Sequence, residues 1–159
     1  MERATRKKVL RMITYGLYIM TAADGEDIAA GAVTWLSQAS FEPPLIMVGV
    51  KVGSHLHQQI DRTGTFAVNI LAADQQDVAQ AFFGPTRREG DRLNGYPFER
   101  GPTTGAPLLI DLPAWFEARV VDRVARGDHT VFVAEVVNAG VRREAKPLAL
   151  RDTPWMYGG

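Results

Sequence analysis

The sequence contains no cysteine, which excludes disulfides, thiolate catalysis and cysteine-ligated metal clusters. Its three histidines, His55, His57 and His129, have no carboxylate cluster beside them, so no metal site is expected. No run of about 18 apolar residues exists, which predicts no membrane span. The N-terminal stretch also lacks the apolar core and cleavage site of a signal peptide. We therefore expect a cytoplasmic protein.

Neither sign of charge is in excess, because 18 basic residues balance 18 acidic ones. Nothing in the overall charge favours nucleic acid or a membrane surface as a partner. The 159 residues, 46% apolar and 23% charged, are ordinary for a globular protein and favour a single domain over residues 1–159. The basic residues near the start are interpreted as the solvated face of a helix: Arg3, Arg6, Lys7, Lys8 and Arg11.

Several common enzyme motifs are missing. No Gly-x-Gly-x-x-Gly follows a predicted strand, and no Gly-x-x-x-x-Gly-Lys loop is present. There is no Gly-x-Ser-x-Gly elbow, and no pair of acidic residues is spaced for glycoside hydrolysis. A nicotinamide dinucleotide, if one binds, is therefore expected to bind only transiently.

Hydrophobic patterning predicts mainly strands. The pattern predicts a hairpin around Asp24-Gly25, formed by residues 15–21 and 28–36. It predicts a central strand over residues 45–51. Residues 65–71 read as the next strand. Residues 115–124 and 130–137 form a second hairpin around the turn at 126–128, and 148–150 could add a last short strand.

Short helices are expected between some of the strands. Residues 3–13 predict an amphipathic helix that packs on the body of the protein. Ser54 is a plausible N-cap for a helix through Ile60, and Asp74 for one that carries Phe82 and Phe83 as exposed aromatics. Residues 84–107 show no periodicity and predict a long functional loop. The expected fold is mainly β (α+β), a β-barrel with peripheral helices.

Three segments carry the most specific signals: residues 34–44, with small hydroxyl residues and an aromatic before an acidic residue and two prolines; residues 50–57; and the Gly-Asp-His-Thr turn at 127–130. Residues 66–71 and 150–159 fit the same pattern. In this order they resemble the flavin reductase-like domain family. The resemblance implies an FMN-binding split β-barrel that works as a homodimer, with flavins at the interface and NADH or NADPH as a transient substrate.

The resemblance also implies where the flavin would lie. The ring is a flat, mostly apolar slab with polar edges, and it needs an apolar floor with polar groups at its rim. The first segment would lie along this ring and its ribityl chain. Phe83 and the aromatic residues near the end of the chain would cover it. The implied residues are Val33, Thr34, Trp35, Ser37, Gln38, Phe83, Trp155 and Tyr157.

The second segment would hold the phosphate. Lys51 supplies a positive charge, Gly53 permits close approach of the backbone, and Ser54 begins a helix with free N–H groups. Val50 belongs to the same implied set. Many relatives have a threonine at the position of Leu56, so His57 or His55 is expected to take over its contact. Such a site serves FMN or FAD.

In the third segment, His129 matches a family histidine near the nicotinamide and the reactive edge of the flavin. A histidine there would orient the dinucleotide or take part in proton transfer. The alternative is a purely structural turn residue.

The leading function is NAD(P)H-dependent reduction of flavin, with electrons passed to free flavin, a monooxygenase component or another acceptor. Three alternatives stay open. They are an FMN-binding electron-transfer protein without direct NAD(P)H activity, a pyridoxamine-phosphate oxidase-like enzyme, and an oligomeric binding protein without flavin.

Overall fold

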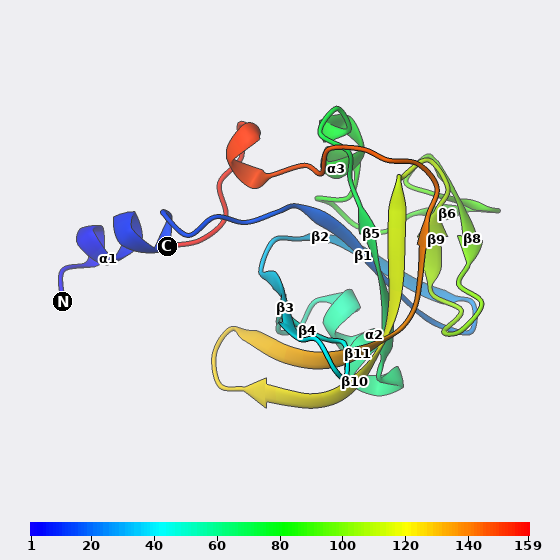
Figure 1. Ribbon diagram of the computed structural model, residues 1–159, viewed down its shortest axis with the longest axis horizontal. Coiled ribbons are helices and arrows are strands. Elements are labelled where there is room, and N and C mark those ends of the chain that lie inside the picture. Colours follow the sequence, from blue (N-terminus) through cyan, green and yellow to red (C-terminus); the bar gives the residue numbers. More distant parts are fainter.

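The larger of two sheets has seven strands, all paired antiparallel, in the computed structural model, which describes residues 1–159. The strand order is β2-β1-β5-β10-β11-β4-β3. Register shifts in the β10–β11 pair near Glu117 and Val120 mark bulges, which bend strands. Figure 1 shows these two long strands running along one side and then turning beneath the body. The strands are β1 (Tyr18–Asp24), β2 (Asp27–Val33), β3 (Leu36–Ser40), β4 (Leu45–Lys51), β5 (Thr65–Ile70), β10 (Ala114–Ala125) and β11 (His129–Val141).

A four-stranded sheet and a few helices complete the fold. The small sheet contains β6 (Arg88–Glu89), β7 (Arg92–Leu93), β8 (Tyr96–Arg100) and β9 (Pro107–Leu109). The helices are α1 (Arg3–Leu10), α2 (His55–Thr63), α3 (Gln76–Ala81) and the 3₁₀-helix η1 (Leu150–Asp152). The expected mainly β fold with an antiparallel sheet and peripheral helices is confirmed. No helix is both long and apolar enough to cross a membrane.

Two apolar clusters stabilise this arrangement. In the first, α2 packs against β1, β2 and β4, with Leu56 and Ile60 four residues apart on its buried face. Strand β4 alternates between buried and exposed residues, as expected for a strand with one face on a core. The second cluster lies on the other side of β1 and includes α3, Phe82 and the small sheet. The cavity described below borders both clusters.

Several local predictions are confirmed. Strand β4 has the predicted bounds, and the hairpin turn between β1 and β2 contains Gly25 at φ +61°. Ser54 is the N-cap of α2, where its side chain accepts a hydrogen bond from the His57 N–H. Residues 126–128 connect β10 to β11. Each of these signals depends on a few neighbouring residues, which explains their accuracy.

Other predictions were wrong. The expected strand over 28–36 is two strands, because the chain leaves β2 after Val33 and crosses to the opposite edge of the sheet as β3. Asp74 does not cap α3, whose N-cap is Gln75. Phe82 is buried in the second cluster, not exposed. Residues 147 and 149 form only isolated bridges, and the chain then turns into η1 from Leu150.

Residues 84–107, predicted as a loop without regular structure, contain β6, β7 and β8. Glu117 of β10 organises the turn that follows β8. Its buried carboxylate accepts hydrogen bonds from the backbone N–H groups of Thr103 and Thr104, from the Thr104 hydroxyl and from Asn138. Burial alone would raise the pKa of this carboxyl, but the hydrogen bonds from Thr104, Thr103 and Asn138 more than offset it and hold the pKa below its ordinary value.

Replacing Glu117 by glutamine is expected to lower the free energy of unfolding by about 1.5–3 kcal/mol, because the amide NH₂ would face N–H donors. The melting temperature should fall by roughly 3–12 °C at pH 7. A carboxyl whose pKa is lowered in the folded protein stabilises the fold at pH values above its ordinary pKa. This contribution is lost as the pH falls through the lowered pKa. The difference from wild type should therefore shrink below about pH 4.3. Thermal melts across pH, with the exposed Glu144→Gln as control, test this, and a difference independent of pH would contradict it.

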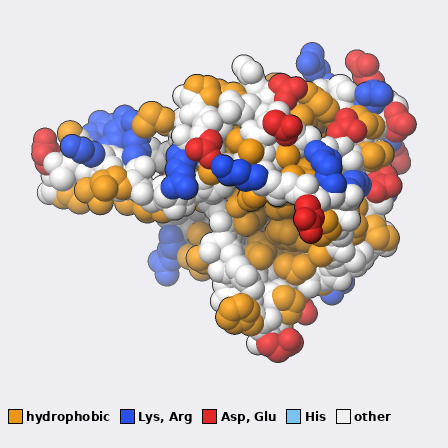
Figure 2. All heavy atoms as spheres, turned by 45° about the horizontal axis from the view of Figure 1, so that its top comes forward, with side chains coloured by type: hydrophobic (Ala, Val, Ile, Leu, Met, Phe, Trp, Pro, Cys, Tyr) orange, Lys and Arg blue, Asp and Glu red, His pale blue; other side chains and the backbone are white.

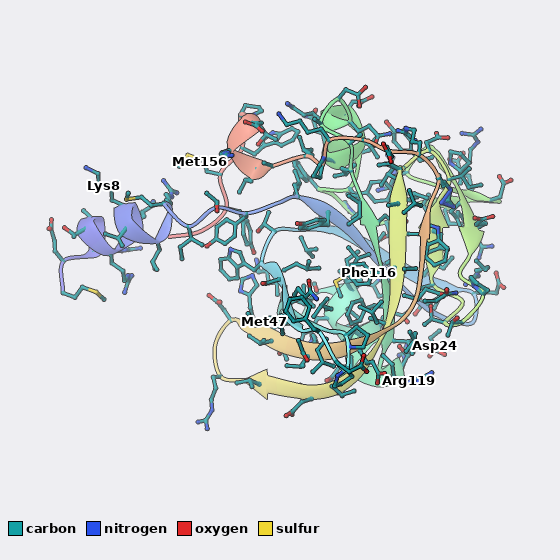
Figure 3. All side chains as sticks on the ribbon, viewed as in Figure 1. Lys8, Asp24, Met47, Phe116, Arg119 and Met156 are labelled. Atoms are coloured by element: carbon teal, nitrogen blue, oxygen red, sulfur yellow. The ribbon has the colours of Figure 1, made fainter.

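Helix α1 does not pack on the body, contrary to expectation. It has no buried residue and projects from the rest of the molecule (Figure 1). Figure 2 shows this arm with basic side chains along one edge and hydrophobic ones along the other. Lys8 lies far out on it, whereas Met156 lies nearer the body (Figure 3). The apolar Val9, Met12 and Ile13 are all more than half exposed, so this chain leaves most of their surface uncovered.

Candidate functional site

A cavity of about 710 Å³ opens where β2 and β4 end and α2 begins. Residues 82–86 and 155–157 form its other walls. Its volume falls in the range of about 300–1,000 Å³ that small-molecule sites occupy. Nine residues predicted from the sequence line it together: Val33, Thr34, Val50, Lys51, Ser54, Phe83, His129, Trp155 and Tyr157.

Trp35 and Ser37 border a different space. They line a second hollow of about 600 Å³ on the far side of Trp35, together with Tyr15 and Met47. The Trp35 ring lies 4.4 Å from the His129 ring, between centroids, and 5.2 Å from the ring of Tyr157. His129 lines both spaces. Trp35 therefore supports the wall of the first cavity without lining it.

The remaining predicted residues line neither space. Gln38 is exposed on β3, where its side chain donates to the Ser40 carbonyl. Gly53 forms the turn after β4, at φ +83°. His57 points to the sheet, where its Nε2 lies 2.8 Å from the Thr130 hydroxyl. His55 and His57 were the two candidates for the contact that a threonine makes in many relatives at the position of Leu56. Of the two, His55 is the one that lines the cavity.

One end of the cavity is suited to an anion. The Ser54 hydroxyl is occupied by capping, since it accepts from the His57 N–H and donates to the Lys51 carbonyl. The N–H groups of His55 and Leu56, the first two residues of α2, have no acceptor in the chain. Lys51 lines the same end. A cation beside free N–H groups at a helix N-terminus is the usual arrangement for binding phosphate.

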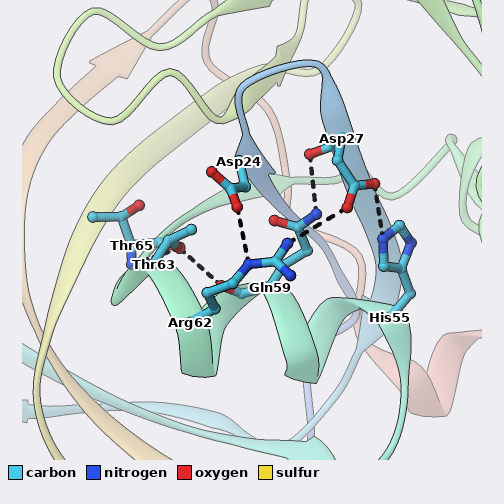
Figure 4. Close-up of polar contacts among 7 residues, drawn as sticks. All are labelled: Asp24, Asp27, His55, Gln59, Arg62, Thr63 and Thr65. Atoms are coloured by element: carbon cyan, nitrogen blue, oxygen red, sulfur yellow. Dashed lines mark hydrogen bonds and ion pairs between the residues drawn. The ribbon is translucent and has the colours of Figure 1, made fainter.

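Polar contacts to the β1–β2 hairpin hold α2 in place (Figure 4). His55 Nε2 lies 3.0 Å from Asp27 Oδ1, and Arg62 Nε lies 2.9 Å from Asp24 Oδ2. The buried Gln59 donates to the Asp27 carbonyl at 3.1 Å. The first and third turns of α2 are thus tied to one hairpin, which fixes where its free N–H groups point.

An aromatic wall centres on His129, which pairs with Lys51 across strands β11 and β4. Its Nδ1 lies 2.8 Å from Asp128 Oδ1, and its Nε2 lies 2.7 Å from the Tyr157 hydroxyl. The hydrogen bond from His129, followed by the electrostatic interaction with the same ring, lowers the pKa of the Asp128 carboxyl. Burial, with a smaller contribution from Asp128, raises the pKa of the Tyr157 phenol. Near neutral pH, Asp128 is therefore an acceptor and Tyr157 keeps its proton.

Thr34 provides a test of whether a flavin fits. Its hydroxyl is buried at the cavity wall and has no hydrogen-bond partner in the chain. Because an unpaired buried polar group is costly, this atom calls for a polar group on a ligand. More than half of the 22 lining residues are hydrophobic, and the anion end lies beside them. These features fit a flat aromatic ligand with polar edges and a phosphate.

Sequence reasoning missed part of the lining. The small residues Ala30, Gly31 and Ala32 of β2 form one wall, and Thr86 donates to and accepts from the Ala30 backbone at its edge. Met156, Leu17 and Leu150 also line the cavity. The run of small residues in β2 was a visible signal, because it leaves room beside a strand.

The fold and cavity thus define a small β protein with a site for a phosphorylated aromatic cofactor. A model of the flavin reductase like domain family matches residues 10–156. The chain therefore belongs to this family, as the ordered segments of its sequence had indicated.

Individual relatives agree with this assignment. The chain is 30% identical over 139 residues to an NADH-dependent FAD reductase of Streptomyces globisporus, covering 87% of this chain and 76% of that one. It is 32% identical over 123 residues to the "Probable flavin reductase" of Rhizobium meliloti (strain 1021), covering 76% of this chain but only 38% of the relative's length. Among solved structures, the flavin reductase component of a bacterial two-component tryptophan halogenase superposes with a TM-score of 0.80 at 28% identity, covering 98% of this chain and 96% of that one.

Proposed function

We propose that this protein is an NAD(P)H-dependent flavin reductase that binds FMN, or the FMN half of FAD, in the main cavity. One observation carries the proposal. An apolar cavity with a buried, unpaired Thr34 hydroxyl ends at Lys51 and at the free N–H groups of His55 and Leu56. Membership of the flavin reductase like domain family supports the proposed activity, which is the reduction of flavin by NADH or NADPH.

Each part of the cavity would have its own role. Lys51 and the start of α2 would bind the phosphate, and the Thr34 hydroxyl would meet a polar edge of the ring or the ribityl chain. Phe83 and Trp155, whose rings meet edge to face at 4.7 Å, would cover the flavin and exclude water. His129, which lines the cavity, would orient a nicotinamide that enters it.

A bound flavin would accept a hydride from NADH or NADPH and pass its electrons to an acceptor. The absence of a dinucleotide-binding motif favours transient binding of this substrate. The acceptor is proposed to be free flavin or an oxygenase component, because a structural neighbour serves a two-component halogenase. NADH and NADPH are cytoplasmic metabolites, which favours a cytoplasmic location.

Anaerobic reduction tests the activity. The FMN-loaded protein is mixed with NADH and, separately, with NADPH, and the flavin absorbance is followed. We expect bleaching with at least one of them. A flavin that stays oxidised with both, yet is reduced by dithionite, would contradict the reductase and favour an electron-transfer protein.

We also infer that the protein is a homodimer. An isolated helix of eight residues is not stable in water, and α1 buries nothing in its own chain. A second copy of the chain would cover the exposed Val9, Met12 and Ile13. It would also cover the adjoining second hollow, which is lined by Ile13, Trp35 and Met47. Sedimentation equilibrium of the FMN-loaded protein should give twice the chain mass of 17.5 kDa, and Ile13→Asp should shift it toward one chain. A monomer that holds FMN tightly would contradict the dimer.

A further inference from the structure

Asp128, His129 and Tyr157 form a continuous chain of hydrogen bonds that runs from the second hollow, which Asp128 lines, to the main cavity, which Tyr157 lines. Asp128 is almost fully exposed, with 92% of its side-chain surface accessible, whereas the His129 side chain is only 13% accessible. The imidazole is held on both ring nitrogens, at 2.8 Å by Asp128 and at 2.7 Å by Tyr157. The Trp35 ring packs against it at a tilt of 43°. Its position is therefore fixed before any ligand arrives.

The direction of these hydrogen bonds follows from the donors and acceptors available. An ionised carboxylate can only accept, so His129 Nδ1 must carry a proton. In the neutral imidazole, Nε2 is then an acceptor, and the Tyr157 hydroxyl donates to it. His129 thus presents to the cavity an acceptor nitrogen whose partner is the phenol of Tyr157.

Tyr157 is in a position to be exchanged for a ligand. It belongs to residues 155–157, which line the cavity but lie outside every helix and strand. The residue is 44% exposed, and its ring contacts Trp35 and His129, so the hydroxyl can leave Nε2 by a small shift that keeps most of these contacts. The nicotinamide carboxamide carries an N–H donor that could replace the phenol on Nε2. Displacement would then exchange one hydrogen bond for another.

We propose that Asp128 and Tyr157 are positioning residues for His129: the carboxylate keeps the imidazole proton on Nδ1, and the phenol holds Nε2 until an N–H donor of the dinucleotide replaces it. The second part rests on the proposed reductase function. The first part concerns the free protein and holds independently of it.

Long-range ¹⁵N NMR of the imidazoles tests the first part without any substrate. Only three histidines occur, so loss of one signal set in His129→Gln assigns the resonances. At a pH where the imidazole is neutral, wild type should show a protonated Nδ1 and an unprotonated Nε2. Asp128→Asn should move the proton toward Nε2, and the exposed Asp91→Asn should not. A wild-type proton on Nε2, or no change in Asp128→Asn, would overturn the role of Asp128.

Tyr157→Phe tests the second part, because it removes the hydroxyl and keeps the ring. The His129 Nε2 resonance should move, since it loses its donor. The apparent dissociation constant for NADH or NADPH, from the concentration dependence of anaerobic flavin reduction, should fall about two- to tenfold, because no phenol must be displaced. The maximal reduction rate should change less than this constant. Tyr96→Phe, whose ring packs on Phe82 away from His129, is the control.

A merely structural Tyr157 predicts weaker dinucleotide binding and lower thermal stability in Tyr157→Phe. An unchanged or higher dissociation constant would therefore overturn the exchange. If neither NADH nor NADPH reduces wild-type flavin, the proposed function fails and the exchange fails with it. The NMR result then still decides the role of Asp128.

Discussion

Replacing Lys51 by alanine is expected to weaken FMN binding about ten- to hundredfold and to leave riboflavin binding nearly unchanged. Only FMN carries a phosphate, and Lys51 is the cation that lines the cavity beside the free N–H groups of His55 and Leu56. A charge-assisted hydrogen bond to phosphate is stronger than a neutral one, and its loss leaves only the two N–H groups. Fluorescence titrations of both flavins measure the effect.

A matched control variant distinguishes the effect of a charge beside the cavity on FMN binding from the effect of the protein's net charge. Lys8→Ala removes the same side chain from the projecting helix α1 (Figure 3), where Lys8 lines neither hollow, and should leave both affinities unchanged. An equal loss of FMN and riboflavin binding in Lys51→Ala would contradict the phosphate role and indicate that Lys51 acts on folding. A loss in Lys8→Ala of similar size would contradict a specific site.

Replacing His129 by alanine is expected to slow flavin reduction by NAD(P)H at least about tenfold, which corresponds to roughly 1.4 kcal/mol. The apparent KM should rise and the reduction rate fall together, because a misplaced hydride donor reacts slowly. FMN affinity should change less than the reduction rate, since Lys51 and the free N–H groups of His55 and Leu56 remain in place to bind the phosphate. Anaerobic stopped-flow reduction at several NADH concentrations measures both parameters.

FMN affinity and thermal stability of the His129 variant serve as controls. Unchanged reduction would show that His129 is a structural turn residue, as the alternative interpretation of the sequence holds. His129 also packs on Trp35, so His129→Gln is a second variant that keeps more of this contact. Slow reduction in both variants, with FMN affinity retained, is the expected outcome.

The phosphate end of the cavity was predictable from sequence because its determinants are local. A strand that ends in Lys51, a glycine turn and a serine N-cap occupy consecutive positions, and the free N–H groups follow from helix geometry. The choice between His55 and His57 was not predictable. Residues two apart on a helix face different sides, and only the packing of Leu56 and Ile60 on the sheet decides which histidine reaches the cavity.

Long-range contacts explain the larger errors. Strands β6 and β7 have two residues each, too few for any periodicity, and the turn after β8 depends on Glu117, which lies 13 positions beyond Thr104. The split of the predicted strand at Thr34 depends on β3 pairing with β4 at the far edge of the sheet. The amphipathic pattern of α1 was read correctly as a helix, but its covering surface is absent from this chain.

Titration of the flavin-free protein with FMN, followed by flavin fluorescence, tests the central claim most directly. The account predicts a saturable change at micromolar protein, with one FMN bound per chain and with binding weakened in Lys51→Ala. No saturable change under these conditions would contradict the assignment of the cavity as a flavin site.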